Sequence, residues 1–254
     1  GTAMTPVTGW DASEFTAAAG TRVHAAVLGP PDAPVVVCVH GLGCSHRYFL
    51  PLARRLATTA RVVAPDLPGF GRTKGPPDAL DVRGLSRALA DWLRATDRGG
   101  CVLVANSTGC QVVVDMAVHA PGLLGPVVLN GPTIDRHARS TSRQGARLLV
   151  DALFERPTLW LVLARDRVDS GNRRFFMTLA HKLTDPIERK LPLVPSPAIV
   201  ARGARDPIVS HEWAAEVAEL LPFGRLVEVP GAGHTLNYSA PDELAELVRP
   251  LLRG

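Results

Sequence analysis

The stretch 102-VLVANSTGC-110 places a serine where a short apolar run ends and a helical pattern begins. The run VLVA favours a buried strand, and the residues from Gly109 to about Ala120 favour a helix. A sharp strand-to-helix corner strains the backbone of the residue at its tip and leaves room only for very small residues two positions away. Ala105 and Gly109 meet that requirement. We therefore predict that Ser107 projects from the turn at the N-terminus of the helix, where free N–H groups favour negative charge.

Short apolar strands alternate with amphipathic helices on both sides of this turn. Apolar residues at helical spacing predict helices around 85–93, 213–221 and 244–251. Apolar and β-branched runs predict strands at 23–28, 35–39, 61–64, 101–105, 127–129, 198–201 and 226–229. This alternation predicts an α/β fold with a mostly parallel, doubly wound sheet that helices cover on both faces. In such sheets, ligands bind beyond the carboxyl ends of the strands.

Polar and glycine-rich turns follow several of the predicted strands. They read HGLG at 40–43, DLPGFGRT at 66–73, ANSTG at 105–109, GARDPIV at 203–209 and GAGH at 231–234. With these motifs in this order, the chain resembles the α/β-hydrolase fold family over essentially its whole length. The resemblance implies that Ser107 is the nucleophile, His234 the general base and acid, and Asp206 the carboxylate that orients His234. It also implies an oxyanion hole made by the backbone N–H groups of Leu42 and Thr108.

The chemistry of these residue types predicts a cofactor-independent serine hydrolase with no metal. Histidine can take the serine proton near neutral pH, and a carboxylate on its other ring nitrogen fixes the tautomer. We expect the substrate to be a small or medium carboxylic ester, thioester or lactone. Two alternatives stay open: hydrolysis of a C–C bond in a vinylogous diketone, and a catalytically silent, ligand-binding member of the fold. Asp135 is a rival to Asp206, because it also follows a predicted strand.

The segment 133–190 interrupts the alternation of strands and helices and contains helical patterns only. We predict that it is a helical lid, which divides the α/β-hydrolase core into 1–132 and 191–254. The apolar faces of a lid would exclude water and shape a pocket for an apolar substrate group. The candidate pocket residues are Cys44, Phe49, Trp160, Phe175 and Phe176.

Composition narrows the classes of partner. The chain has 254 residues, 46% of them hydrophobic, which suits one α/β domain with an insertion. The net charge is +4, but the basic residues are scattered among acids and only 5% of the residues are aromatic, so nucleic acid is not expected as a partner. An apolar run long enough to span a bilayer is missing, so we predict a cytoplasmic protein without a membrane partner. The identity of the substrate and the oligomeric state cannot be predicted from the sequence.

Overall fold

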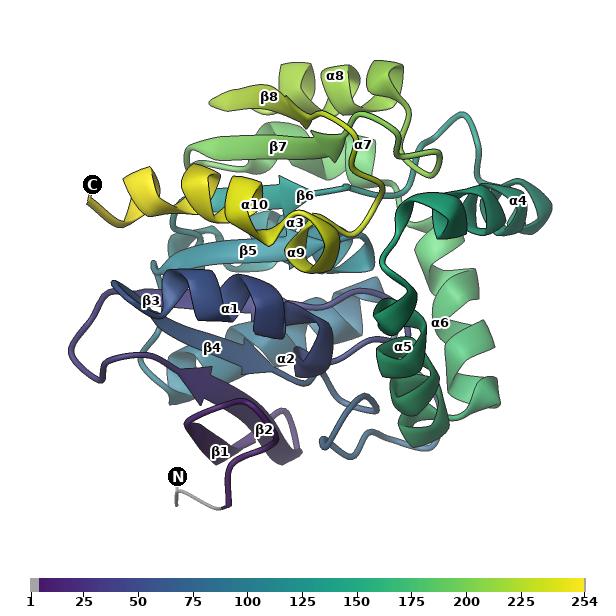
Figure 1. Cartoon of the computed structure of the whole chain (residues 1–254). Helices are drawn as coiled ribbons and strands as arrows, with labels where there is room; N and C mark the ends of the chain where they lie inside the picture. The colour runs from purple at the N-terminus through teal and green to yellow at the C-terminus, as the bar shows by residue number, and fades with distance from the viewer. Residues whose placement is uncertain (1–4, 254) are drawn as a thin grey trace.

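A central sheet of eight strands organises the chain, in the order β1-β2-β4-β3-β5-β6-β7-β8 (Figure 1). The computed structural model describes residues 5–253, apart from the side chains of residues 141, 142, 149 and 153. The strands are β1 (Ala12–Ala18), β2 (Thr21–Leu28), β3 (Val35–Val39), β4 (Arg61–Pro65), β5 (Val102–Asn106), β6 (Val127–Asn130), β7 (Ala198–Gly203) and β8 (Gly224–Val229).

The strands from β4 to β8 are parallel, and only β2 runs antiparallel to its neighbours β1 and β4. All five residues of β5, at the centre of the sheet, are buried. Burial on both faces explains why this strand is an unbroken apolar run rather than an alternating one. The predicted α/β class with a mostly parallel sheet is therefore confirmed.

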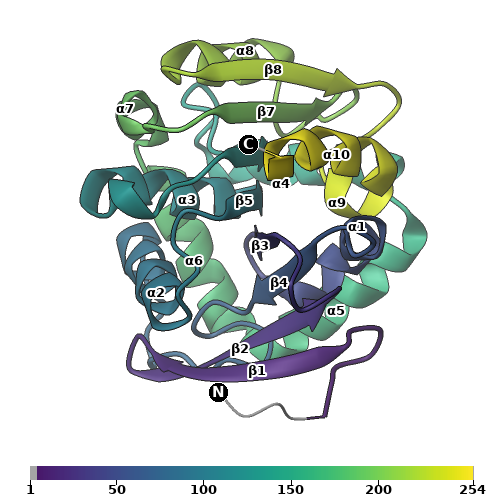
Figure 2. The ribbon, with the colours of Figure 1, turned by 90° about the vertical axis from the view of Figure 1, so that its left-hand side faces the viewer.

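Helices cover both faces of the sheet, as Figure 2 shows in a view along it. The helices α2, α3 and α8 lie on one face and α1, α9 and α10 on the other. Their bounds are α1 (Leu50–Leu56), α2 (Val82–Ala95), α3 (Thr108–His119), α8 (His211–Leu220), α9 (Leu236–Ser239) and α10 (Pro241–Val248). A short 3-10 helix, η1 (His46–Phe49), precedes α1. This is the doubly wound arrangement that the sequence predicts.

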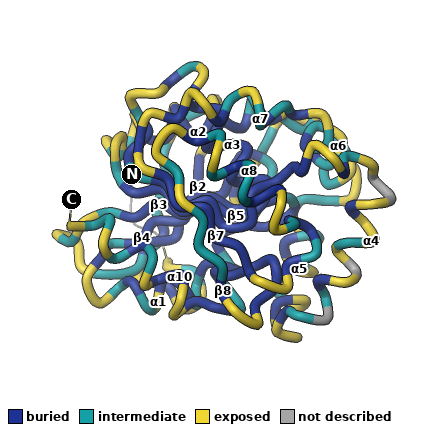
Figure 3. Tube along the Cα trace, turned by 90° about the horizontal axis from the view of Figure 1, so that it is seen from above, coloured by how far each residue is buried: buried dark blue, intermediate teal, exposed yellow. Residues whose placement is uncertain are grey.

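Two apolar layers form the core, one on each face of the sheet. In β3, Val37 and Val39 pack into the layer under α2, α3 and α8, whereas Val36 and Cys38 pack into the other. This assignment follows from the side-chain period of two along a strand. Figure 3 shows the central strands as a buried centre, whereas exposed residues lie on the outer sides of helices, in loops and in outer strands such as β8.

A run of helices between β6 and β7 interrupts the alternation of strands and helices. It comprises α4 (Thr141–Asp151), α5 (Pro157–Ser170), α6 (Asn172–Thr184) and α7 (Ile187–Lys190), with the short 3-10 helices η3 (Ala152–Phe154) and η4 (Leu191–Leu193). We call residues 133–190 the helical insertion. Its helices α4, α5 and α6 lie beside the carboxyl ends of the strands (Figure 1). It therefore lies over the edge of the sheet where ligands are expected.

No helix within residues 5–253 is both long enough and apolar enough to cross a membrane.

Candidate active site

Ser107 lies at a strained turn between β5 and α3. Its backbone has φ 55° and ψ −118°, a positive φ that non-glycine residues rarely adopt. The turn also brings α3 very close to β3, because a Cβ atom on Gly109 would lie 2.3 Å from the carbonyl oxygen of Val39. Glycine at 109 is therefore required by the close approach of two backbones, and this geometry is the one predicted from ANSTG.

Asp206 and His234 meet beyond the carboxyl ends of β7 and β8. Nδ1 of His234 donates to Oδ2 of Asp206 over 2.7 Å, and both side chains are buried. Oδ1 of Asp206 accepts hydrogen bonds from the backbone N–H groups of Ile208 and Val209. Burial opposes a charged imidazole, but the Asp206 carboxylate outweighs it and holds the pKa of His234 above its ordinary value of 6.5. The carboxylate thus fixes the tautomer that leaves Nε2 free to accept a proton.

In the described structure, Ser107 and His234 are not hydrogen-bonded to each other. Among the described residues, Nε2 of His234 is buried without a hydrogen-bond partner. The Ser107 hydroxyl oxygen instead accepts a hydrogen bond from Nζ of Lys182, over 3.1 Å. Catalytic hydrogen bonds are often long in free enzymes and shorten only when substrate binds. The buried Nε2 atom is therefore available to a proton donor in the site.

The two backbone N–H groups expected to form the oxyanion hole are free in the described part of the chain. Thr108 is the first residue of α3, where N–H groups have no partner within the helix, and the Leu42 N–H also donates to no protein group. The loop that carries Leu42 is fixed at Gly41, whose N–H donates to the Tyr48 hydroxyl over 2.8 Å. The Tyr48 hydroxyl in turn donates to Oδ1 of Asn106, next to Ser107, over 3.0 Å. The loop and the nucleophile turn are thereby held in one frame.

Asn106 connects this frame to the histidine loop. Its Nδ2 donates to the backbone carbonyls of Asn130 and His234, over 3.2 Å and 3.3 Å. A single buried amide side chain thus contacts groups from three of the turns that build the site. In the sequence, only the position of Asn106 directly before the serine points to this role.

Two carboxylates of the helical insertion hold the main chain of the histidine loop. Asp151 accepts a hydrogen bond from the His234 N–H over 2.8 Å, and Glu155 accepts one from the Thr235 N–H over 2.7 Å. Both acids are buried. The insertion therefore contributes directly to the position of His234, which the sequence did not predict.

Lys182, in α6 of the insertion, was also missed from the sequence. Its side chain is only 6% exposed, and its backbone carbonyl accepts a hydrogen bond from Nε2 of Gln111 in α3 over 3.0 Å. Phe175 lies seven residues earlier in α6 and packs on the Leu42 loop, since a Cβ atom on Gly43 would lie 2.8 Å from its ring. Residues seven apart share a helix face. That spacing was the signal that could have placed Lys182 on the inner face of α6.

Asp135, the rival to Asp206, lies elsewhere. One of its oxygens accepts from the His137 N–H over 2.9 Å and the other from Nη1 of Arg147 over 3.3 Å. It makes no hydrogen bond to His234 in the described structure. Asp206 is the acid that the structure places against the imidazole.

The structure places the five candidate pocket residues in different surroundings. Trp160 and Phe176 are 42% and 59% exposed, so their side chains lie largely at the surface, and their place in a pocket stays a prediction. Helical periodicity defines a face but not which face turns inward. Phe49 is fully buried in the core layer beside α1 and offers no surface to a pocket, so its predicted place there is corrected. Cys44 and Phe175 both lie at the Leu42 loop, where Cys44 Sγ donates to the Leu42 carbonyl over 3.3 Å.

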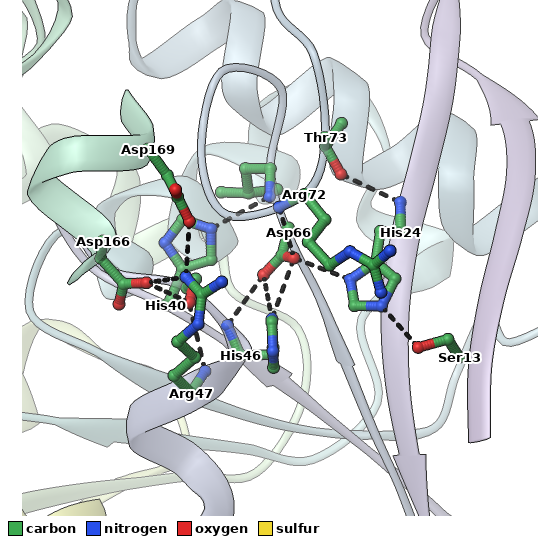
Figure 4. Close-up of polar contacts among 12 residues, drawn as sticks. Ser13, His24, His40, His46, Arg47, Asp66, Arg72, Thr73, Asp166 and Asp169 are labelled. Atoms are coloured by element: carbon green, nitrogen blue, oxygen red, sulfur yellow. Dashed lines mark hydrogen bonds and ion pairs between the residues drawn. The ribbon is translucent and has the colours of Figure 1, made fainter. Parts of the chain in front are cut away.

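A second polar cluster surrounds Asp66, between β4 and α2 (Figure 4). His24, His46 and Asp66 are buried, and their potential metal-ligating atoms lie within 4.8 Å of one another. Each carboxylate oxygen is already occupied, because His24 Nδ1 lies 2.8 Å from Oδ2 and the His46 N–H donates to Oδ1 over 2.8 Å. The Arg72 N–H adds a further hydrogen bond to Oδ2. This donor set is satisfied internally, so we assign the cluster a structural role in joining β2 to two loops.

The fold and this geometry define a class of proteins: α/β proteins with a serine at a strained strand-to-helix turn and a histidine–carboxylate pair at neighbouring strand ends. The model of the alpha/beta hydrolase family matches residues 36–247. The chain belongs to the alpha/beta hydrolase family.

Individual relatives are distant. The chain is 24% identical to the "Magnesium-chelatase 30 kDa subunit" of Rhodobacter capsulatus, over 89% of each protein. It is 26% identical to the "Putative carbamate hydrolase RutD" of Rhizobium rhizogenes, over 89% of this chain and 95% of the relative. Among solved structures, a thermophilic esterase from Thermogutta terrifontis superposes with a TM-score of 0.77 at 19% identity, over 95% of this chain and 98% of the esterase. The structural likeness supports the shared fold.

Proposed function

We propose that the protein is a cofactor-independent serine hydrolase that cleaves a small or medium carboxylic ester, thioester or lactone through an acyl-serine intermediate. One observation carries the proposal. Ser107 projects from a strained turn with φ 55°. At the same edge of the sheet, Asp206 and His234 are bonded over 2.7 Å, and among the described residues Nε2 of His234 is buried without a partner. Strain of this kind persists where the surrounding structure enforces it and is concentrated at functional sites.

In the proposed reaction, the Ser107 hydroxyl oxygen attacks the acyl carbon as its proton passes to Nε2 of His234. The tetrahedral intermediate collapses, the bond to the leaving group breaks, and His234 returns the proton to that group. A water molecule then attacks the acyl-serine and gives its proton to His234. The second tetrahedral intermediate collapses, the bond between the acyl carbon and the Ser107 oxygen breaks, the acid is released, and His234 returns the proton to Ser107. Asp206 stabilises the imidazolium that forms in each step.

The Leu42 and Thr108 N–H groups would stabilise the oxyanion in both tetrahedral intermediates. In other enzymes, removing one such donor costs about 2.7 to 4 kcal/mol of transition-state stabilisation. The site is also well covered, because Ser107 and His234 are 9% and 5% exposed. We propose that the helical insertion acts as the lid that excludes water and selects the acyl group.

One relative is named a putative carbamate hydrolase, so carbamates should be tested as substrates too. The same attack on a carbonyl carbon would cleave them. The presence of Ser107, His234 and Asp206 together argues against a silent, ligand-binding member. C–C bond hydrolysis stays an alternative that no particular contact of the described residues favours.

A fluorophosphonate probe tests the nucleophile. We expect covalent labelling of the wild-type protein at Ser107, detected by peptide mass spectrometry, and none in Ser107→Ala. Ser86→Ala, which removes a hydroxyl bonded to His119 at the end of α3 opposite Ser107, is the matched control and should label like wild type. Labelling that persists in a folded Ser107→Ala protein would refute the proposal.

A further inference from the structure

Lys182 places a cation beside the nucleophile without a counter-ion. Its Nζ donates to the Ser107 hydroxyl oxygen over 3.1 Å, and its side chain is 6% exposed. In the described part of the chain, it makes no ion pair with a carboxylate within 4.0 Å. A buried ammonium group without a paired anion is costly, because it loses its hydration and gains little in exchange.

The acids nearest to Lys182 in sequence and space are already used. Asp185, three residues later, accepts a hydrogen bond from Gln111 and pairs with Lys190. Asp206 is bonded to His234 and to two backbone N–H groups. Lys190 is thus neutralised twice, through Asp115 and Asp185, whereas Lys182 has no carboxylate partner among the described residues.

Lysine is unusual at position 182, because almost all basic residues of the chain are arginine. Only positions 74, 182 and 190 are lysine among the 28 basic residues. An ammonium group is a compact point charge on a flexible stem, so it fits into a narrow site and can shift from one acceptor to another. The hydrogen bond from Gln111 to the Lys182 carbonyl fixes the start of that stem relative to α3, the helix that follows Ser107.

We propose that Lys182 is a specificity-determining residue that binds a carboxylate of the substrate, so that the preferred substrates are half-esters or related acyl compounds with one negative charge near the scissile carbonyl. This inference rests on the proposed serine hydrolase function of the same site. When the substrate carboxylate binds, it takes the hydrogen bond that Ser107 accepts in the free protein. The Ser107 hydroxyl is then released toward Nε2 of His234, which lacks a partner until that point.

The short distance between Lys182 and Ser107 limits the substrate. A carboxylate oxygen lies about 2.8 Å from an ammonium nitrogen in such a pair, and an attacked carbon lies about 3 to 3.5 Å from the nucleophile. With Nζ and Oγ only 3.1 Å apart, malonyl to glutaryl half-esters fit, and long-chain anionic esters do not.

The charge of Lys182 persists at neutral pH. Desolvation lowers the pKa of Lys182 from 10.5 to about 8, while the negative charge of Asp206 opposes that shift. The side chain therefore remains mostly an ammonium ion at pH 7 and becomes a neutral amine only in mildly alkaline solution.

Methanol release from matched esters tests the inference. Monomethyl succinate and dimethyl succinate differ by one charge, and we expect wild-type protein to have the higher kcat/KM with the monoester at pH 7. Lys182→Met should lower the ratio of the two kcat/KM values by at least about thirtyfold, because it leaves the substrate carboxylate buried without a partner. Lys182→Arg keeps the charge and should keep more of the preference than Lys182→Met.

Lys74→Met is the matched control, since it removes the same charge from an exposed lysine outside the site and should leave the ratio unchanged. Inhibition of wild-type protein gives a second measurement that needs no variant at the site: succinate should inhibit competitively and the neutral succinamide should not. An unchanged ratio in Lys182→Met, or equal inhibition by the two compounds, would overturn the inference. An equal fall with both esters would also overturn it and would indicate that Lys182 acts on the nucleophile itself.

Fluorophosphonate labelling separates this inference from the proposed function. Labelling at Ser107 together with no charge preference would refute the role of Lys182 alone. Failure to label Ser107 in wild-type protein would refute the hydrolase mechanism.

Discussion

At the scale of single residues, the site depends on which group each carboxylate contacts. Asp206 meets His234 over 2.7 Å, whereas the carboxylate of Asp135 is bonded to Arg147 and to a backbone N–H. Two acids that both follow strands of the same sheet therefore have different surroundings. A position after a strand does not distinguish the two acids, but the GARDPIV motif favours Asp206, and the structure places Asp206 against the imidazole.

This difference predicts the effect of two amide substitutions. Asp206→Asn should lower kcat by about 10³ to 10⁴, because the amide favours the wrong tautomer of His234. Asp135→Asn should lower it by less than about tenfold, since Asp135 touches no reacting group. Steady-state turnover of an activated ester by both variants, with melting temperatures near wild type, checks the order. The reverse order would remove Asp206 from the mechanism.

The pH dependence of the rate should differ between neutral and anionic substrates. With a neutral diester, kcat/KM should rise as His234 loses its proton. Burial and Lys182 lower the pKa of His234, but the charges of Asp206, which bonds the ring, and Asp151, which bonds the His234 main chain, outweigh them and hold that pKa above 6.5. With a half-ester, the rate should also fall as Lys182 loses its proton near pH 8. Profiles from pH 5 to about 10 at constant ionic strength should show a plateau for the first and a bell for the second. Identical profiles for the two esters would contradict the assignment of the alkaline limb to Lys182.

At the scale of elements, the helical insertion is attached to the core by an ion pair at α5. Figure 4 shows Arg47, from η1, directed toward Asp166 and Asp169. Asp166 is 1% exposed and also accepts a hydrogen bond from the Ser45 hydroxyl over 2.7 Å. This contact lies on the side of the insertion away from α4, so it fixes α5 against the loop that carries Leu42.

Loss of this ion pair should loosen the insertion more than the sheet. We expect Arg47→Met to destabilise the protein by about 1 to 3 kcal/mol, because the buried Asp166 carboxylate loses its charged partner. Trypsin should then cleave within residues 133–190 faster than in wild type, while the core fragments persist. The double variant Arg47→Met, Asp166→Asn removes the unpaired charge and should recover part of the loss. Cleavage spread evenly over core and insertion would show that α5 is not anchored at this point.

The strands β2 to β8, the helices α2, α3, α8 and α10 and the active-site turns were predictable because each one is encoded locally, whereas β1 was missed. The serine turn needs small residues at 105 and 109, and buried parallel strands need continuous apolar runs. The insertion was only partly predictable. Its helical content follows from spacing, but Trp160 and Phe176 are largely exposed and Lys182 is buried. Which face of an amphipathic helix turns inward depends on what it packs against, and those partners are far away in sequence.

At the scale of the whole molecule, Asp66 links segments that lie far apart in the sequence. Its carboxylate contacts β2 through His24 and η1 through His46. Burial alone would raise the pKa of Asp66, but the hydrogen bonds and charges of His46 and His24 outweigh it and hold that pKa well below 3.8. As the pH falls, the unfolded chain therefore takes up the proton first. The stability that Asp66 contributes is complete above the unfolded pKa and is lost progressively below it.

Acid should consequently unfold the protein through this group. We expect the free energy of unfolding to decline below about pH 4, with Asp66 contributing up to about 1.4 kcal/mol per pH unit. Urea unfolding at pH 6, 5, 4 and 3 measures that slope, which should be shallower in Asp66→Asn. Asp78→Asn, which alters an exposed aspartate, is the control and should keep the wild-type slope. Equal slopes in all three proteins would exclude Asp66 as the source of the acid sensitivity.

The hydrogen bonds from the His234 and Thr235 main chain to Asp151 and Glu155 have a consequence for protein engineering. Enzyme designers treat such helical segments as exchangeable cassettes, grafted from one scaffold to another to transfer substrate preference. In this chain, a chimaera that received a foreign segment would lose both carboxylates along with Lys182, and among the described residues His234 would keep only the hydrogen bonds to Asn106 and Asp206. Recombination between this protein and a distant relative would therefore succeed only when the crossover carries the histidine loop together with the segment that holds it.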